Sequence, residues 1–183
     1  MYKDYGKNVF KINDFTRIAI NIDQTYLRDT SLIKNVIKLC EENNLPNNFL
    51  SFEIPEDMIP DNIDKVKSFA KELSNYHIFF SVDRFTGAYI GSEKLKELGF
   101  NEIKIDRSLV TKIDKDPIQL KAVSEIIENA HKVGITVGAV GVENEAQCKA
   151  LKELDNNMVV QGYLFYKPLT RSDLISAIIS YDK

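Results

Sequence analysis

The sequence has no strong excess of charge and no long apolar run, and each absence excludes a class of protein. Its 183 residues carry 24 basic and 27 acidic side chains, a formal net charge of −3. Such a mildly acidic chain has no general electrostatic attraction to nucleic acid or to an anionic membrane. No apolar run is long enough to span a bilayer, and the initial MYKDYGKNVF lacks the apolar core of a signal peptide. We therefore expect a cytoplasmic protein that binds neither nucleic acid nor membrane.

Cysteine and glycine-rich motifs are also scarce. The two cysteines, Cys40 and Cys148, stand alone in helix-like segments, which predicts buried structural thiols in a reducing compartment rather than a metal site. No glycine-rich phosphate loop follows the first apolar segment, which argues against a dinucleotide-binding fold. The sequence has no internal repeat, and its length and 44% hydrophobic content suit one globular domain.

Short apolar segments alternate with amphipathic segments along the chain. The first kind predicts strands at 17–22, 49–54, 77–83, 101–106, 134–140 and 157–162. The second predicts helices at 31–44, 62–75, 92–99, 117–134, 144–155 and 171–181. This alternation is typical of βα units around a parallel sheet. Because the predicted strands are almost continuously apolar, we expect the sheet to be covered on both faces. A closed barrel of eight units usually needs about 250 residues, so about six units predict an incomplete barrel.

Polar side chains recur where the predicted strands end, and reactive groups in parallel βα barrels project from those ends. Carboxylate and amide oxygens suit Mg²⁺ or Mn²⁺, and a lysine beside them suits a phosphate or an activated water. The pattern therefore favours a metal-dependent phosphate site. The strand-end residues are Asn21, Glu53 with Glu56, Asp83 with Arg84, Lys104 with Asp106, Val140 with Glu143, and Gln161.

Structural roles for the same residues stay open at this point. Asn21 and Gln161 would also serve as strand-end caps. Glu53 and Lys104 would also form an ion pair across the barrel mouth. Asp83 and Arg84 would also form an ordinary solvated pair. His77 and His131 lie away from the predicted mouth, so we expect them in core or cap roles.

The order and spacing of these residues resemble the EAL family, barrel phosphodiesterases that linearise cyclic di-GMP with divalent metals. AINID (19–23) is similar to the family's V-N-L-S, and FEIPE (52–56) to its L-E-L/I-T-E. IKID (103–106) and QGYLF (161–165) match L-K-I-D and Q-G-Y closely. The resemblance runs from about Phe15 onward. It implies a barrel fold, a loop supported by Glu56, and a guanine beside the segment after Q-G-Y that holds Tyr166. It also implies metal ligands at Asn21, Glu53 and Asp83, a catalytic Lys104, and ligand contacts at Asp106, Gln161 and Pro168.

The same comparison identifies three departures from the family pattern. VDRFTGAY (82–89) has Arg84 at the second aspartate of D-D-F-G-T-G, and AVGVE (139–143) has Val140 at the first glutamate of A-E-G-V-E. The E-A-L tripeptide and its neighbouring arginine have no counterpart before Asn21. A guanidinium at position 84 would repel a cation and pair with Asp83 or Glu53. A valine neither ligates a metal nor takes a proton.

We therefore predict an α/β, EAL-type barrel without its first one or two strands. Residues 1–14 are expected to be a tail or junction, and residues 15–183 a degenerate EAL-like domain. The expected function is a protein-interaction module in cyclic di-GMP signalling, with an unidentified protein partner or as a homodimer, and with no cofactor. Two alternatives stay open: a sensor that binds cyclic di-GMP without turnover, and a weak Mg²⁺- or Mn²⁺-dependent phosphodiesterase completed from outside this sequence.

The first predicted strand would leave a free barrel edge, which exposes unpaired backbone groups and apolar side chains. We expect residues 2–12, a second copy or a partner to cover it. VFKI (9–12) has the composition of one short added strand.

Overall fold

The computed structural model describes residues 17–29, 31–46 and 49–181, and residues 1–14, predicted to be a tail or junction, lie outside this range. Every predicted strand and every predicted helix is present. The strands are β1 (Ile18–Asn21), β2 (Leu50–Pro55), β3 (Phe79–Phe85), β4 (Glu102–Ile105), β5 (Thr136–Val140) and β6 (Val159–Gln161). The α-helices are α2 (Ser31–Glu42), α3 (Ile63–Asn75), α4 (Ser92–Leu98), α5 (Arg107–Val110), α6 (Pro117–Lys132), α7 (Glu145–Leu154) and α8 (Arg171–Tyr181). Short 3-10 helices are η1 (Tyr26–Arg28), η3 (Glu56–Met58) and η4 (Pro60–Asn62).

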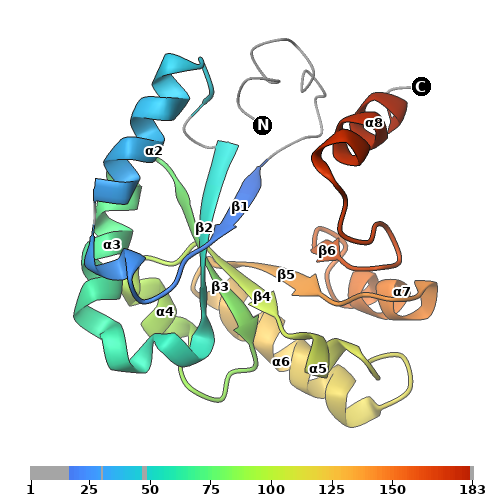
Figure 1. The fold of residues 1–183 in the computed structure, drawn as a ribbon. Helices are drawn as coiled ribbons and strands as arrows, with labels where there is room; N and C mark the ends of the chain where they lie inside the picture. Colours follow the sequence, from blue (N-terminus) through green and yellow to red (C-terminus); the bar gives the residue numbers. More distant parts are fainter. Residues whose placement is uncertain (1–16, 30, 47–48, 182–183) are drawn as a thin grey trace.

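The strands form one parallel sheet in the order β1-β2-β3-β4-β5-β6, so each strand pairs with its neighbour in sequence. The sheet curls into a half-barrel, with helices on its convex side (Figure 1). All strand carboxyl ends therefore lie at one end of the sheet, as the sequence predicted for an EAL-type barrel. In the described residues β1 and β6 are the two outer strands.

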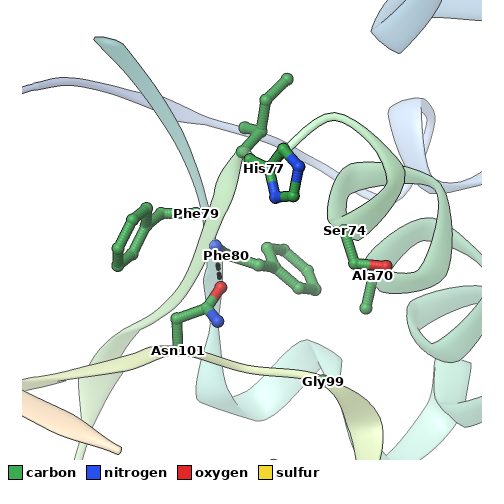
Figure 2. A pocket seen from close by; sticks show the side chains of 8 residues that line it. Ala70, Ser74, His77, Phe79, Phe80, Gly99 and Asn101 are labelled. Carbon is green, nitrogen blue, oxygen red and sulfur yellow. Dashed lines mark hydrogen bonds between the residues drawn. The ribbon is translucent and has the colours of Figure 1, made fainter. Parts of the chain in front are cut away.

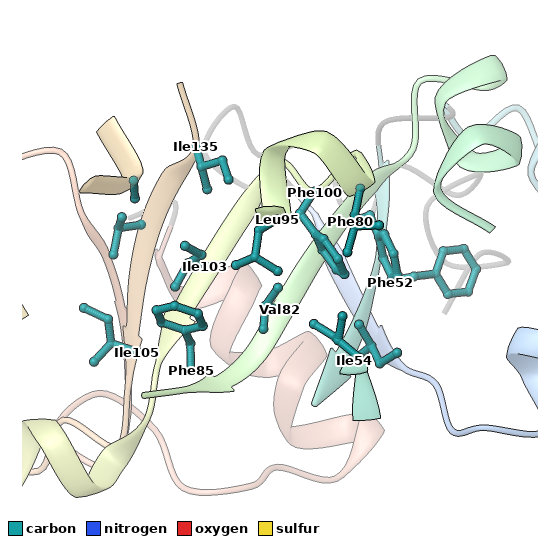
Figure 3. Close-up of a cluster of buried hydrophobic side chains, with 14 of the residues drawn as sticks. Phe52, Ile54, Phe80, Val82, Phe85, Leu95, Phe100, Ile103, Ile105 and Ile135 are labelled. Carbon is teal, nitrogen blue, oxygen red and sulfur yellow. The ribbon is translucent and has the colours of Figure 1, made fainter. Parts of the chain in front are cut away.

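The hydrophobic core lies between the convex face of the sheet and the helices (Figure 3). Phe52, Phe80 and Ile103 project from three strands into this layer and are almost fully buried. Phe80 stacks on Phe100 with ring centroids 4.3 Å apart. Apolar positions at every second strand residue meet the apolar stripes of the helices, so this layer buries alternate residues of the central strands.

The concave face is different, and the expectation of two covered faces is wrong toward the edges of the sheet, in β1, β5 and β6. Ala19 of β1, Thr136 of β5 and Gln161 of β6 are exposed, and Val159 of β6 retains 66% exposure. At the centre of the concave face the buried residues are charged or polar, including Glu53, Ser81 and Glu102. The strands at the edges of the sheet are also apolar in sequence, so the sequence did not reveal that their concave face is exposed.

Local sequence signals define several helix ends near the site. Asp116 accepts a hydrogen bond from the Ile118 amide (2.9 Å), and Pro117 opens α6. Asn144 and Gln147 form a reciprocal capping box at the start of α7. Gly99 ends α4 with φ of 94°, a left-handed conformation that glycine adopts without strain. The caps of α6 and α7 fix the loops that leave the carboxyl ends of β4 and β5, whereas Gly99 leads into the start of β4.

Candidate functional site

The centre of the candidate site is an ion pair between Glu53 of β2 and Lys104 of β4. The two strands flank β3, and the side chains meet on the concave face, where Lys104 Nζ donates to Glu53 Oε1. The side chains retain only 16% and 7% exposure for Lys104 and Glu53, respectively. The structure thus contains the ion pair that the sequence left open as a structural alternative.

The charge balance of Glu53 depends on this contact. Burial is the largest influence and raises the pKa of the Glu53 carboxyl. The hydrogen bond and the charge of Lys104 lower that pKa, and the nearby charges of Asp83 and Glu102 raise it. Lys104 therefore opposes the rise that burial causes in the pKa of Glu53.

A second polar layer lies on the same face, two residues nearer to the amino ends of the strands. Arg17 Nη2 donates to Glu102 Oε1 (3.2 Å), and Ser81 Oγ donates to Glu102 Oε2 (2.8 Å). The Arg17 guanidinium also lies over the Phe79 ring, 4.0 Å from its centroid. Sequence reasoning missed these residues. The available signal was spacing, because Glu102 and Lys104 are two apart in one strand and so share a face.

Arg84 points away from the site. The β3–β4 register shifts between Val82 and Phe85, and Arg84 has φ of 52°, which is uncommon for a residue other than glycine. Such an irregularity re-aims a side chain. Arg84 Nη2 lies 3.8 Å from Asp57 Oδ1, and both side chains are more than half exposed. The expected pairing of Arg84 with Asp83 or Glu53 is therefore wrong.

The loop after β3 is held by a buried carboxylate, Glu56. Its Oε2 accepts from the Thr86 amide (2.8 Å) and hydroxyl (2.9 Å), and its Oε1 accepts from the Tyr89 amide (3.1 Å). Glu56 is 2% exposed, so the loop is attached to a rigid point next to β2. A rim hollow of about 200 Å³ lies beside it, between Arg84 and Asp106.

The end of β5 is shaped by a close approach of its backbone to a side chain. Val140 ends β5 in register with Gln161, the last residue of β6. Gly141 follows with φ of 80°, and a Cβ there would lie 2.4 Å from Arg107 Cγ. Arg107 Nη2 in turn donates to Glu143 Oε1 at 2.6 Å, which holds Glu143 at the exposed rim. Glu143 therefore does not stand in for a carboxylate at position 140.

The remaining predicted site residues take separate positions. Asn21 is exposed at the end of β1, in register with Glu53. Asp106 caps α5 by accepting from the Ser108 amide (2.7 Å). Gln161 and Pro168 are exposed, and Pro168 lies in the connection between β6 and α8. Asn21, Glu53, Asp83, Lys104 and Gln161 thus share the carboxyl end of the sheet, whereas Asp106 and Pro168 lie on the connections beyond it.

The donors present do not fit a site for two divalent cations. Glu53 is bonded to Lys104, Arg84 turns outward, and Val140 offers no donor atom. Across the part of the chain that the structure describes, no group of three or more His, Cys, Asp or Glu side chains is arranged to hold a metal ion. Asn21 and Asp83 are further oxygen donors at these strand ends, and Mg²⁺ prefers six oxygen ligands.

A second hollow lies at the opposite end of the strands (Figure 2). It has a volume of about 260 Å³ and lies between α3 and the starts of β3 and β4. His77 lines it with φ of 58°, just after α3, and Asn101 Oδ1 accepts from the Phe80 amide (2.9 Å). His131 makes a 3.3 Å contact with Asp155. Both histidines therefore lie near helix ends and away from the carboxyl-end site.

The described helices include none that is both long and apolar enough to span a membrane.

Comparison with known proteins agrees with the fold and the motifs. A family model described as the EAL domain matches residues 3–168. The chain belongs to the EAL domain family.

Two curated relatives from Pseudomonas aeruginosa show the level of similarity. The cyclic di-GMP phosphodiesterase NbdA is 31% identical over 165 residues, which cover 90% of this chain and 21% of NbdA. The cyclic di-GMP phosphodiesterase RocR is 30% identical over 155 residues, which cover 83% of this chain and 38% of RocR. The chain thus spans well under half the length of these relatives.

A solved structure of the EAL domain of Mycobacterium smegmatis DcpA has the same fold. It superposes with a TM-score of 0.85 at 24% identity, over 98% of this chain and 80% of that domain. At this identity the likeness establishes the fold alone.

Proposed function

We propose that this EAL domain acts in cyclic di-GMP signalling as a protein-interaction module and does not hydrolyse the dinucleotide. The observation that carries the proposal is the loss of two carboxylates of the family pattern, because Arg84 pairs with Asp57 at the rim and Val140 has no donor atom. Metal-assisted hydrolysis needs an activated water and a cation near the departing oxygen. Without carboxylates at positions 84 and 140, the chain lacks two of the ligands that would hold such cations.

An exposed segment beside the site supports a role in protein interaction. Residues 163–169, which we call the aromatic segment, follow the outer strand β6. Tyr163, Phe165, Tyr166 and Leu169 in this segment retain 58%, 48%, 56% and 40% exposure. Clustered apolar exposure of this kind marks interaction sites in soluble proteins. Tyrosine and phenylalanine are also enriched at the centres of protein interfaces.

A second candidate function is binding of cyclic di-GMP without turnover. Gln161 ends β6, and Tyr166 and Pro168 are exposed on the connection that follows. An exposed ring next to an amide can stack on a base and hydrogen-bond to its edge. The names of NbdA and RocR as cyclic di-GMP phosphodiesterases support this ligand class for the family.

The first experiment measures hydrolysis and binding separately. The chain is incubated with cyclic di-GMP and Mg²⁺ or Mn²⁺, with RocR as the positive control, and the linear product is quantified. We expect no product above background. Turnover that is lost in an Asp83→Ala variant would refute the proposal. Calorimetric titration with cyclic di-GMP, with and without Mg²⁺, then separates the two candidates, because only the sensor gives a saturable heat.

The second experiment tests the aromatic segment. Tyr166→Ser should abolish capture of a protein partner from a lysate of the source cells. Tyr89→Ser is the matched control, because Tyr89 is 62% exposed but lies on the loop after β3. Equal loss in both variants, or in neither, would exclude the aromatic segment as the binding surface.

A further inference from the structure

The outer strand β6 has an unpaired edge among the strands that the structure describes. It pairs with β5 alone, at the side of the half-barrel from which the chain continues to α8 (Figure 1). The Gln161 carbonyl accepts from the amide of Val142, just after β5 (3.0 Å). Because the backbone groups of successive strand residues point to opposite sides, the amide and carbonyl of Val160 point to the unpaired edge. Such an edge is a template for one further strand from another chain.

A single turn after β6 presents the aromatic segment beside this edge. The amides of Phe165 and Tyr166 donate to the Gly162 carbonyl at 3.1 and 3.3 Å. The Leu164 amide donates to the Val142 carbonyl (3.1 Å), and the Leu164 side chain packs on the hydrophobic core. Phe165 and Tyr166 stay exposed on the turn that Leu164 fixes. The two rings can therefore contact a partner at little cost in conformational entropy.

The stretch that carries β6 and the aromatic segment contains no acidic side chain. Residues 156–172 are the longest run of the sequence without Asp or Glu, in a chain with 27 acidic residues, and they include Lys167 and Arg171. The acidic residues beside this stretch already have partners, because Asp173 accepts from a threonine hydroxyl and Glu143 is paired with an arginine. This surface is therefore locally basic, although the whole chain is acidic.

Lys167 differs from other exposed lysines in having no carboxylate beside it. Lys94, Lys121 and Lys149 each pair with a glutamate three or four residues away on the same helix. Lys167 is exposed and takes part in none of the ion pairs among the described residues. Its ammonium group is therefore available to a carboxylate from another molecule.

We propose that β6 and the aromatic segment bind an extended, acidic segment of a partner protein, which adds to β6 as a strand. This inference rests on the interaction function proposed above and specifies the chemistry of its partner. Val160 supplies backbone hydrogen bonds to the added strand, and the rings of Phe165 and Tyr166 supply apolar contact. Lys167 pairs with a carboxylate of the partner and repels a basic segment, so it selects the acidic one.

Selection of a random dodecapeptide library on the full chain tests the chemistry of the partner. The enriched peptides should be rich in Asp and Glu and poor in proline, because proline interrupts the hydrogen bonds of an added strand. Tyr166→Ser should weaken binding of the best peptide about tenfold or more. Enriched peptides that are neutral or basic but still need Tyr166 would overturn the acidic partner and leave the interaction function standing. Selection that enriches no peptide through Tyr166 would overturn both.

Fluorescence anisotropy with the best peptide tests the role of Lys167. Lys167→Glu should weaken binding about tenfold, whereas Lys149→Glu should change it less than about twofold. Lys149 is the matched control, because its side chain is 79% exposed but lies on α7, outside the acid-free stretch. Equal effects of the two substitutions would overturn the proposal. Tighter binding to phosphatidylglycerol vesicles or to polyuridylate than to the peptide would assign the surface to a membrane or to RNA and would also overturn it.

Hydrogen exchange of the unmutated chain locates the bound peptide. Saturation with the peptide should slow exchange of the Val160 amide about tenfold or more, because this amide points to the unpaired edge. The Gln161 amide, which faces β5, is the internal control and should change less than about twofold. An unchanged Val160 amide in the saturated chain would show that the peptide does not add to β6, and would overturn the proposal even if Lys167→Glu weakens binding.

Discussion

The two faces of the half-barrel are built from different chemistry. On the convex face, Phe52, Phe80 and Ile103 are buried against helices, and shape complementarity holds the layer together. On the concave face, Glu53 with Lys104 and Glu102 with Arg17 form the buried centre. Apolar burial on the convex face therefore stabilises the sheet, and the buried charged residues lie on the concave face.

The two faces also differ in how much they contribute to the stability of the domain. Burial of apolar area provides most of the folding free energy. Buried ion pairs contribute little net stability, because the loss of hydration offsets their attraction, but breaking one is costly. We therefore expect convex-face truncations to cost the most, ion-pair truncations somewhat less, and changes at the exposed rim almost nothing.

The largest effect is expected for Phe80→Ala on the convex face. Phe80 is 1% exposed and stacks on Phe100. Its truncation should lower the free energy of unfolding by about 4 kcal/mol. Val159→Ala on the concave face, at 66% exposure, should change it by less than about 0.5 kcal/mol. Urea denaturation of both variants measures the contrast, and similar losses for the two would mean that the faces do not differ as described.

Lys104→Met should be the next most damaging change, because it leaves Glu53 buried without a cation. We expect a loss of about 3 kcal/mol near neutral pH. Burial already raises the pKa of Glu53, and loss of Lys104 raises it further. The folded state then binds a proton more tightly than the unfolded state, so the stability of the variant rises as pH falls through the raised pKa toward the unfolded value.

The control for this variant is Lys104→Met with Glu53→Gln, which removes the buried charge along with its partner. Chemical denaturation across pH 4 to 8, the range that brackets an ordinary and a raised glutamate pKa, should show a steep dependence for the single variant only. A flat profile for Lys104→Met would indicate that Glu53 reaches solvent when unpaired.

A smaller loss is expected where the β5 and β6 connections touch. A Cβ on Gly162 would lie 2.0 Å from the Val142 carbonyl oxygen, so Gly162→Ala must displace backbone. We expect a cost of about 2 kcal/mol. Gly91→Ala is the matched control, because a Cβ there meets nothing within 4 Å. Thermal unfolding that is unchanged in Gly162→Ala would show that this connection moves freely.

Much of this architecture could be predicted from the sequence. The alternation of apolar and amphipathic segments located every strand and every helix except the single turn α5 and the short 3-10 helices, and the motifs around Asn21, Glu53, Lys104 and Gln161 located the carboxyl end of the sheet. Periodicity could not reveal that the concave face is polar at its centre and exposed at its edges. The polarity and exposure of the concave face depend on which strands the sheet contains, whereas the periodicity of a sequence indicates only the surroundings of a single strand.

The direction of Arg84 was also beyond sequence reasoning. A regular strand would place Asp83 and Arg84 on opposite faces, but the register shift after Val82 and the positive φ of Arg84 change that alternation. Irregularities of this kind result from the local fit between strands. By contrast, the Glu53–Lys104 pair followed from strand ends that share one mouth, and it was among the alternatives considered.

The smallest effect is expected for Arg84→Asp, because the side chain lies at the rim. The Arg84–Asp57 pair spans 3.8 Å between side chains that are more than half exposed. Exposed pairs contribute less than about 1 kcal/mol, and aspartate tolerates a positive φ better than most residues. Thermal melts of the parent and Arg84→Asp should therefore differ by only a few degrees, with no added effect of millimolar Mg²⁺. A melting temperature that rises with Mg²⁺ in Arg84→Asp alone would show that position 84 reaches the Glu53 site, and that outward pairing with Asp57 is not what keeps cations away.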